Sequence, residues 1–423
     1  MAVEATDTQR AIDAVWRIEA PKLIAALTRV VRDIDLAEDL AHDALVAALQ
    51  QWPDAGIPRN PGAWLMAAAK HRAIDQFRRS RMLDRKHQEL GKDVQAAQDA
   101  STPDFEHALD DPVGDDLLRL IFTACHPVLT TEARVALTLR LLGGLTTEEI
   151  ARAFLAAEPT IAQRIVRAKK TLSKAQVPFE VPRGPDLTAR LSSVLEVIYL
   201  IFNEGYSATA GDDWIRPSLC EEALRLGRIV AGLVPQEPEV HGLVALMELQ
   251  ASRLRARVGP DGAPILLADQ NRAQWDQLLI RRGLTALARA EQLAGHDGVY
   301  VLQAAIAACH ARARTADGTD WAEIARLYAR LASVNPSPVI ELNRAVAVAM
   351  AEGPAAALPI VERLADVPTL QRYHLLPTVR GDLLFKLGRL DEAARQFELA
   401  ASLTQNAREQ RLLLDRARAC AAS

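Results

Sequence analysis

The chain has 423 residues, of which 49% are hydrophobic and 25% are charged, with a formal net charge of −4. This length suits two to four domains, and the acidic balance argues against a protein that holds DNA tightly through its overall charge. No apolar run is long enough for a membrane span, and the first residues lack a signal-peptide pattern, so we expect a cytoplasmic protein. Any nucleic-acid contact must come from local basic patches, with a partner supplying the rest.

Aromatic residues make up only 4% of the chain, while Ala, Leu and Arg dominate. These three residue types have high helix propensity, and no alternating strand pattern of useful length is present. The composition therefore predicts an all-α fold. The four cysteines, Cys125, Cys220, Cys309 and Cys420, form no C-x-x-C pair, so we expect buried thiols and neither a metal site nor a disulfide framework. No cofactor is expected.

Charge and proline divide the chain into segments. Residues 93–116 hold eight Asp or Glu and no Lys or Arg, and the preceding residues 70–92 are rich in Lys and Arg. The acidic stretch has little apolar periodicity and predicts a flexible linker over 91–115, either a solvated loop or an electrostatic mimic of nucleic acid. Three prolines in 177–186 predict a second boundary. The expected domains are 10–90, 116–177 and 186–423, and truncation near residue 180 is expected to leave the first two folded.

A first amphipathic helix is predicted over residues 33–52, DIDLAEDLAHDALVAALQQW. Leu36, Leu40, Ala44 and Ala47 form its apolar stripe. The opposite side is acidic with a small apolar centre, which suits either a basic partner helix or plain solvation. The candidate contact residues on that side are Asp35, Asp39, His42, Asp43 and Val46.

A second helix is predicted from Asn60, a capping residue, with Pro61 at the first helical position. Its apolar side gathers Leu65, Met66, Ala69, Ala73 and Phe77. The polar side carries an aromatic ring among arginines, an arrangement that holds unstacked bases of single-stranded DNA. The alternatives are that Trp64 packs into a neighbouring helix and that the arginines are solvated. The candidate residues are Trp64, Arg72, Asp75, Arg78, Arg79 and Arg81.

A helix-turn-helix is predicted over residues 143–175. Gly143 and Gly144 end one helix, and Thr146 with Glu149 forms a capping-box pattern that begins the next. After a break at 156–158, Ile161, Ile165, Ala168 and Leu172 form the core face of a basic helix. The second helix of such a unit enters the DNA major groove, where Arg and Gln bond base edges, although a solvated helical hairpin gives the same pattern. The candidate residues are Thr160, Gln163, Arg164, Arg167, Lys169 and Lys170.

The last third carries a repeat-like pattern of helix pairs. Residues 387–403, LGRLDEAARQFELAASL, resemble a tetratricopeptide repeat (TPR), and 351–367 echo them weakly. Gly353 and Gly388 are 35 residues apart, close to the period of that repeat. The sequence therefore predicts stacked helical pairs near the C-terminus.

The three N-terminal segments, in this order, resemble the extracytoplasmic-function (ECF) sigma factors of bacterial RNA polymerase. DLAEDLAHDALVAAL is similar to the region-2 helix that docks on the β′ clamp helices, PGAWLMAAAKHRAIDQFRRSR to the segment that melts and reads the −10 element, and TTEEIARAF…PTIAQRIVRAKKTL to region 4, which reads the −35 element. The resemblance implies core RNA polymerase, through its β′ clamp and β flap, and promoter DNA as partners. The acidic stretch is similar to the connector between these regions.

A narrower resemblance covers the extension. YLIFNEGYSA, DQNRAQWD and PSPVIELNRAVAVA resemble the subgroup with a large C-terminal TPR-like domain, which implies that the extension modulates activity and binds an unidentified protein or ligand. Two residues depart from the family pattern: His42 stands where Gln is common, and Leu155 stands where many such turns have Gly, which implies an altered turn.

Two other functions fit parts of the sequence. A stand-alone helix-turn-helix regulator with a helical sensor domain would bind its operator without polymerase. An enzyme in the C-terminal domain lacks support, because no P-loop, dinucleotide fingerprint or nucleophile elbow is present. Its densest polar group is Asn203, Glu204 and Tyr206 with Asp212 and Asp213, which helix capping explains more cheaply. We therefore expect no catalytic residue and no enzymatic activity.

Overall fold

The computed structural model describes residues 7–90, 113–154, 156–207, 215–259 and 264–422, and the side chains of 7–10, 13, 76–90, 113–115, 152 and 421–422 are outside that description. In these ranges the fold is all-α, as predicted, with one isolated bridge between Val258 and Pro264 in place of any strand. Among these residues, no helix combines the length and apolarity that a membrane crossing requires. The chain forms two compact units, 1–197 and 198–423, and the division falls within one helix.

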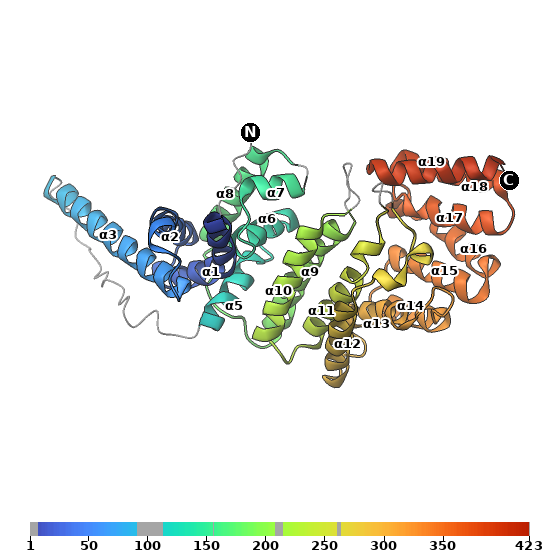
Figure 1. The fold of residues 1–423 in the computed structure, drawn as a ribbon, viewed down its shortest axis with the longest axis horizontal. Coiled ribbons are helices and arrows are strands. Elements are labelled where there is room, and N and C mark those ends of the chain that lie inside the picture. Colours follow the sequence, from blue (N-terminus) through green and yellow to red (C-terminus); the bar gives the residue numbers. More distant parts are fainter. Residues whose placement is uncertain (1–6, 91–112, 155, 208–214, 260–263, 423) are drawn as a thin grey trace. The chain divides into compact units, whose positions relative to one another are not determined.

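Three long helices open the first unit: α1 (Asp7–Val31), α2 (Ile34–Ala55) and α3 (Pro61–Leu90), which pack on one another (Figure 1). Asp33 caps α2 by accepting the Leu36 amide at 3.0 Å, and Asn60 accepts the Ala63 amide at 3.1 Å at the start of α3. These side chains satisfy amides that have no partner within the helix. The predicted cap and first position of α3 are therefore confirmed.

Helices α5 (Val113–Ala124) and α6 (Thr131–Leu141) come next in the chain. The helix-turn-helix follows them as α7 (Thr147–Ala153) and α8 (Glu158–Lys174). Thr146 and Glu149 form the predicted capping box, with the Thr146 amide donating to Glu149 Oε2 at 2.8 Å and the Glu149 amide donating to Thr146 Oγ1 at 3.1 Å. The four predicted core residues of α8 are all buried. Leu155, which stands in the turn, lies outside the described residues.

Helix α5 begins at Val113, inside the acidic stretch that predicted a linker. Asp116 is 1% exposed and its carboxylate bonds Arg29 at 2.8 Å and Arg119 at 2.6 Å. Paired guanidinium groups explain how an acidic residue at the end of this stretch lies in a core. Residues 91–112, the rest of the predicted linker, are outside the described part of the chain.

Helix α9 (Pro185–Tyr206) contributes its first half to the first unit. Arg190 donates to the Phe122 carbonyl at 2.8 Å, Ser193 donates to the Cys125 carbonyl at 2.7 Å, and Arg134 of α6 bonds both Ser193 and Glu196. These contacts count against the expectation that truncation near residue 180 leaves this unit folded, because that cut removes buried partners of α5 and α6. Proline indicates where a helix ends, but it does not indicate which hydrophobic core the next helix packs into.

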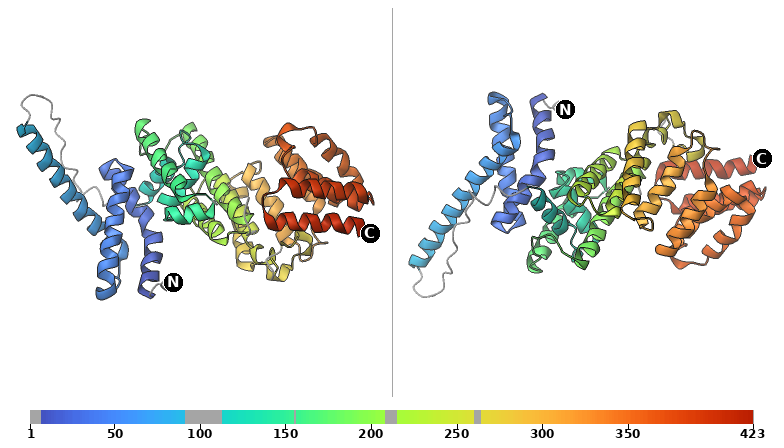
Figure 2. Two further views of the ribbon diagram at one scale, coloured as in Figure 1. Left: turned by 90° about the horizontal axis from the view of Figure 1, so that it is seen from above. Right: turned by 90° about the horizontal axis from the view of Figure 1, so that it is seen from below.

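The second unit consists of antiparallel neighbours in chain order (Figures 1 and 2). It continues from α9 through α10 (Pro217–Leu233), α11 (Pro238–Ala251), α12 (Gln277–Gln292), α13 (Val299–Arg312), α14 (Trp321–Val334), α15 (Pro338–Glu352), α16 (Pro354–Leu364), α17 (Leu375–Lys386), α18 (Leu390–Leu403) and α19 (Ala407–Ala422). Short 3₁₀ turns lie at 254–256, 267–269, 272–274 and 368–370.

Glycines shape two junctions and one close contact near the C-terminus. Gly353 and Gly388 have φ of +99° and +76° where α15 and α17 end, a conformation that costs glycine little. Gly381 of α17 faces the Phe397 ring of α18, and a Cβ there would lie 2.8 Å from the ring. Small residues at such contacts let paired helices approach closely.

All four cysteines are buried, as predicted, and their thiols are free. Burial raises the pKa of Cys125 to about 11 and that of Cys220 to about 12. Both thiols are therefore protonated at neutral pH and unreactive.

Candidate functional site

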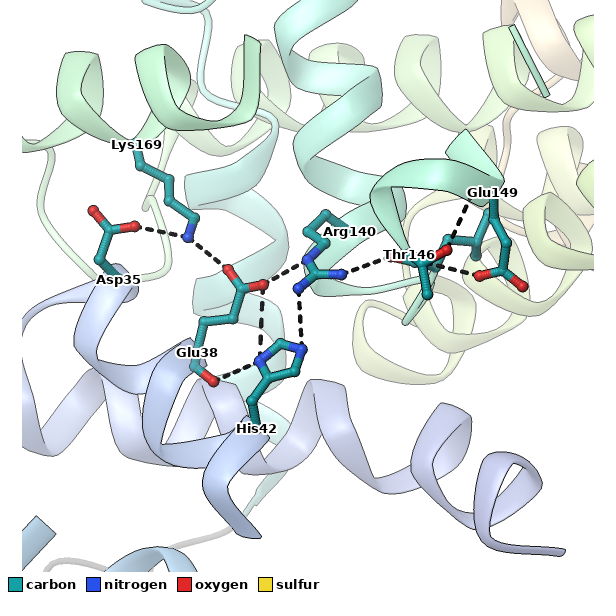
Figure 3. Close-up of polar contacts among 8 residues, drawn as sticks. Asp35, Glu38, His42, Arg140, Thr146, Glu149 and Lys169 are labelled. Carbon is teal, nitrogen blue, oxygen red and sulfur yellow. Dashed lines mark hydrogen bonds and ion pairs between the residues drawn. The ribbon is translucent and has the colours of Figure 1, made fainter. Parts of the chain in front are cut away.

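The candidate surface on α2 is split between solvent and a contact with the helix-turn-helix. Asp35, Asp39, Asp43 and Val46 are exposed, and the Val46 side chain stands 46% exposed among the acidic residues. Asp43 lies 3.8 Å from the Arg72 guanidinium of α3. His42 is partly buried and points toward α6 (Figure 3). The predicted residues therefore lie along one helix, and two of them, Asp35 and His42, also contact α8 and α6.

Glu38 is the centre of that contact, and the sequence pattern did not single it out. Its side chain is only 7% exposed. Glu38 Oε2 lies 2.6 Å from Lys169 Nζ on α8, and Glu38 Oε1 accepts from Arg140 Nε on α6 at 2.5 Å. Lys169 Nζ also lies 2.7 Å from Asp35 Oδ1 (Figure 3). We name these residues, Asp35, Glu38, Arg140 and Lys169 together with His42, the α2–α8 latch.

The charges in the latch stabilise one another despite burial. Burial by itself would raise the pKa of Glu38, but the charges and hydrogen bonds of Lys169 and Arg140 outweigh it and leave the pKa below its ordinary value. Burial likewise would lower the pKa of Lys169, and the Glu38 and Asp35 carboxylates raise it above its ordinary value instead. Both partners are therefore ionised across neutral pH, as a buried pair requires.

His42 joins the latch through both ring nitrogens. Nδ1 lies 2.8 Å from the Glu38 carbonyl oxygen, and Nε2 lies 3.0 Å from Arg140 Nη2. A guanidinium only donates, so Nε2 accepts, and the ring proton sits on Nδ1 and is donated to the carbonyl. The arrangement therefore uses the neutral imidazole, and Arg140 also donates to the Leu145 carbonyl at 3.3 Å just before α7.

The predicted DNA-reading face of α8 is largely open. Thr160, Gln163, Arg167 and Lys170 are exposed, and Arg164 is partly buried. Lys169 differs, because its side chain is 11% exposed and its amine is held by the two α2 carboxylates. In this arrangement five of the six predicted residues can meet an outside partner, and Lys169 cannot.

The candidate residues on α3 are only partly described. Trp64 packs edge-on against Trp52 of α2, with ring centroids 5.3 Å apart, and remains partly exposed. The packing alternative for Trp64 therefore holds for one edge of its ring. Arg72 and Asp75 are exposed. The side chains of Arg78, Arg79 and Arg81 lie outside the described residues, although their backbone belongs to α3.

Two features could have pointed to the latch in advance. Glu38 lies beside Ala37 and one turn before Ala41, both fully buried, so it occupies the edge of an apolar stripe. Arg140 stands near the end of α6, directly after a run of seven buried residues, 133–139. A charged residue bordering a buried face needs a partner of opposite charge. Such a pattern indicates that a partner exists and does not identify it.

The polar group that the sequence singled out in the second unit is only partly described. Glu204 is buried and paired with Arg216, and Asn203 is partly buried. Asp212 and Asp213 lie outside the described residues. In the described parts of the chain, no group of three or more His, Cys, Asp or Glu is arranged to hold a metal ion. The pairing of Glu204 supports its structural interpretation.

Comparison with known families and proteins assigns the first unit. Sigma-70 region 2 matches residues 16–82, Sigma-70 region 4 matches 119–172, and a family of unknown function, DUF6596, matches 190–291. An uncharacterized protein of Rhizobium meliloti is 43% identical over 400 residues, which cover 94% of this chain and 93% of the relative. The RNA polymerase sigma-H factor of Pseudomonas aeruginosa is 29% identical over 180 residues, 40% of this chain and 89% of that protein.

The two sigma-70 matches follow the helices in order. The first spans the end of α1, all of α2 and most of α3, and the second runs from α5 into α8. The helix-turn-helix, its capping box and the amphipathic α2 are thus found where those regions place them. The sigma-70 region 2 and region 4 domains indicate an ECF-type sigma factor, which directs promoter recognition by RNA polymerase.

Proposed function

We propose that this sigma factor is held closed by the α2–α8 latch and becomes active when polymerase separates α2 from α8. The observation that carries the proposal is the position of Glu38. Its carboxylate lies on the helix predicted to dock on polymerase and is bonded by Arg140 and Lys169 of the DNA-reading domain. One helix surface therefore serves two competing partners.

The polymerase contact is assigned to the exposed side of α2. Asp35, Asp39 and Asp43 give that side a negative charge, and Val46 supplies an apolar centre. A basic groove on the β′ clamp would be attracted to such a surface, since complementary charge steers association. His42 and Asp35 reach that surface fully only after the latch opens. The β flap is assigned to the helix-turn-helix domain on the strength of the family resemblance.

Promoter contacts are assigned to α8 and α3. Arg164 and Gln163 have the side chains that bond guanine and adenine edges in the major groove, while Arg167 and Lys170 suit phosphates. Arg72 with the exposed part of Trp64 suits the melted −10 strand, and Arg78, Arg79 and Arg81 extend the same helix. Lys169 joins this surface when Glu38 releases it. No bond is made or broken by these contacts, so the proposed role is not enzymatic.

The second unit is proposed to be a TPR-like domain that modulates sigma activity. Its support is the succession of antiparallel helix pairs and the glycine-dependent contact between α17 and α18. Stacked helical pairs of this kind present extended binding surfaces. Its partner is proposed to be a protein or ligand in the cytoplasm, where transcription takes place.

In vitro transcription with purified core polymerase tests the proposal. We expect promoter-specific transcripts only when both the chain and the core enzyme are present, and gel-shift of promoter DNA only with the core enzyme. Tight DNA binding by the chain alone at physiological salt would favour the stand-alone regulator. Absence of any complex with core polymerase would refute the sigma function.

A further inference from the structure

A groove of about 1190 Å³ lies beside the latch in the first unit, and most of its lining residues have no part in the proposed polymerase and promoter contacts. Its walls come from the junction of α1 and α2, the end of α5, the last two turns of α8 and residues 176–179. Its volume is somewhat above the roughly 300–1,000 Å³ of pockets that enclose drug-sized ligands, so it has room for a ligand of nucleotide size. The groove therefore spans the region-2 and region-4 parts of one compact unit.

The groove carries three cations without an anionic partner. Arg32, Lys170 and Lys174 line it and are exposed, and among the described residues none of the three forms an ion pair. The two other cations of the lining are neutralised, since Arg29 bonds Asp116 and Lys169 bonds Asp35 and Glu38. The excess positive charge thus resides on one side of the groove, on Arg32 and the end of α8.

The carboxylates facing the groove are already engaged. Asp33 accepts the Leu36 amide as the cap of α2, and Asp35 is paired with Lys169. Neither is bonded to Arg32, Lys170 or Lys174.

Two residues that line the groove lie in the left-handed backbone region, just after the ends of α1 and α8. Arg32 has φ of +55° and Gln176 has φ of +48°, and both line the groove. Residues other than glycine adopt this conformation at a cost and often do so at functional sites. The turn at Gln176 directs the chain back along the groove, where Val177 and Phe179 line it together with Ile34 of α2.

We propose that this groove binds a phosphate-bearing ligand of nucleotide size. Arg32, Lys170 and Lys174 would bind the phosphates, since guanidinium and ammonium groups bond phosphate oxygens strongly. Phe179 and Val177 provide an apolar wall for the base. A bare phosphate would need neither that wall nor a groove of this volume, so a nucleoside diphosphate fits the lining better than an inorganic anion.

Binding there would favour the closed state. The ligand touches Arg32 and Ile34 next to α2 and also Lys170 and Lys174 of α8, so it is fully bound only while the two helices remain together. Linkage then requires that the ligand weaken polymerase binding by the same factor that polymerase weakens the ligand. This regulatory consequence rests on the proposed sigma function, whereas the binding itself does not.

Isothermal titration of the full chain with ADP and with inorganic pyrophosphate, at constant ionic strength and without polymerase, tests the site. We expect one ADP per chain, and at least tenfold weaker binding in the double variant Arg32→Gln/Lys174→Gln. The matched control Arg281→Gln/Arg411→Gln removes two exposed charges of the second unit and should bind like the wild type. Phe179→Ala should weaken ADP binding several-fold and leave pyrophosphate unchanged.

Several results would overturn the assignment. No saturable ADP binding, equal binding by the double variant, or equal loss in the control would show that Arg32 and Lys174 do not form a nucleotide site. Equal affinity for ADP and pyrophosphate, together with unchanged ADP binding in Phe179→Ala, would show that the groove does not contact the base. A competition assay then tests the regulation: ADP should weaken polymerase binding of the wild type and not of the double variant, and an identical effect on both would refute the link.

Discussion

Replacing Arg140 with methionine removes the latch cation that is predicted to contact neither polymerase nor DNA. The guanidinium donates to Glu38 Oε1 at 2.5 Å, to His42 Nε2 at 3.0 Å and to the Leu145 carbonyl at 3.3 Å. Methionine keeps the aliphatic stem and loses all three bonds. We therefore expect Arg140→Met to weaken the closed state and to bind core polymerase more tightly than the wild type.

The loss of closed-state stability in Arg140→Met depends on how buried the Arg140 side chain is and on the partners that Glu38 keeps. Removing one partner of a buried pair costs roughly 3–5 kcal/mol, because an unpaired charge is left behind. Glu38 keeps Lys169 as a partner, and the Arg140 side chain is 21% exposed, so the cost here is about 1–3 kcal/mol. A shift of that size raises the apparent affinity for polymerase by roughly 5–150-fold when the closed state dominates.

Equilibrium binding of fluorescently labelled chain to core polymerase measures the change. Arg281→Met serves as the matched control, because Arg281 is an exposed arginine of the second unit. Helix content measured by circular dichroism checks that both variants fold. If Arg140→Met fails to fold, Lys169→Met provides a second variant, because it removes the α8 cation of the latch. Unchanged or weaker polymerase affinity in folded latch variants would refute the reasoning.

Four further predictions concern the latch, the units and the DNA-reading helix. Acid should open the latch, because the lowered pKa of Glu38 makes its contribution present above the ordinary carboxyl pKa and lost as pH falls through the lowered one. Alkali should open it as well, because the raised pKa of Lys169 makes its contribution present below the ordinary amine pKa and lost as pH rises through the raised one. Energy transfer between labels on Ala63 and Ala162 that stayed unchanged at both extremes, in a chain that keeps its helix content, would contradict the assignment. A fragment ending at residue 184 should aggregate or lose helix content, and one ending at residue 206 should not; equal behaviour in solution would mean that α9 is dispensable to the first unit. Gly381→Ala should destabilise the second unit by about 1–3 kcal/mol in thermal unfolding, because the new Cβ lies 2.8 Å from the Phe397 ring, and an unchanged Tm would show that the helices adjust freely. Arg164→Ala should cost about 1–3 kcal/mol at one base pair of the −35 element in binding of the polymerase complex, whereas equal loss on every sequence would mean that Arg164 contacts only phosphate.

Local patterns in the sequence predicted the helices of the first unit well. The Thr146–Glu149 capping box and the Asn60 cap involve residues three positions apart, so their geometry depends only on the local helix. The core face of α8 follows from helical periodicity for the same reason. Such features are visible in a single sequence because both partners are near neighbours in it.

The sequence did not predict the contacts between segments that are distant in the chain. Glu38 and Lys169 are 131 residues apart, and nothing in either segment indicates the other. Periodicity predicted the apolar stripe of α2 correctly. It gives no reason to expect burial of Glu38 at the edge of that stripe, because the partners of Glu38 are distant in the sequence. Helix α9 shows the same limit, since its prolines marked a boundary while Arg190 and Ser193 bind it to the preceding helices.

The distance between α2 and α8 before and after polymerase binding tests the central claim most directly. Cysteines introduced at exposed positions can be labelled selectively, because the four native cysteines are buried. We predict high energy transfer in the free chain and a marked fall when core polymerase is added, with the fall already present in Arg140→Met alone. Energy transfer that stays the same on forming the polymerase complex would contradict a latch that must open.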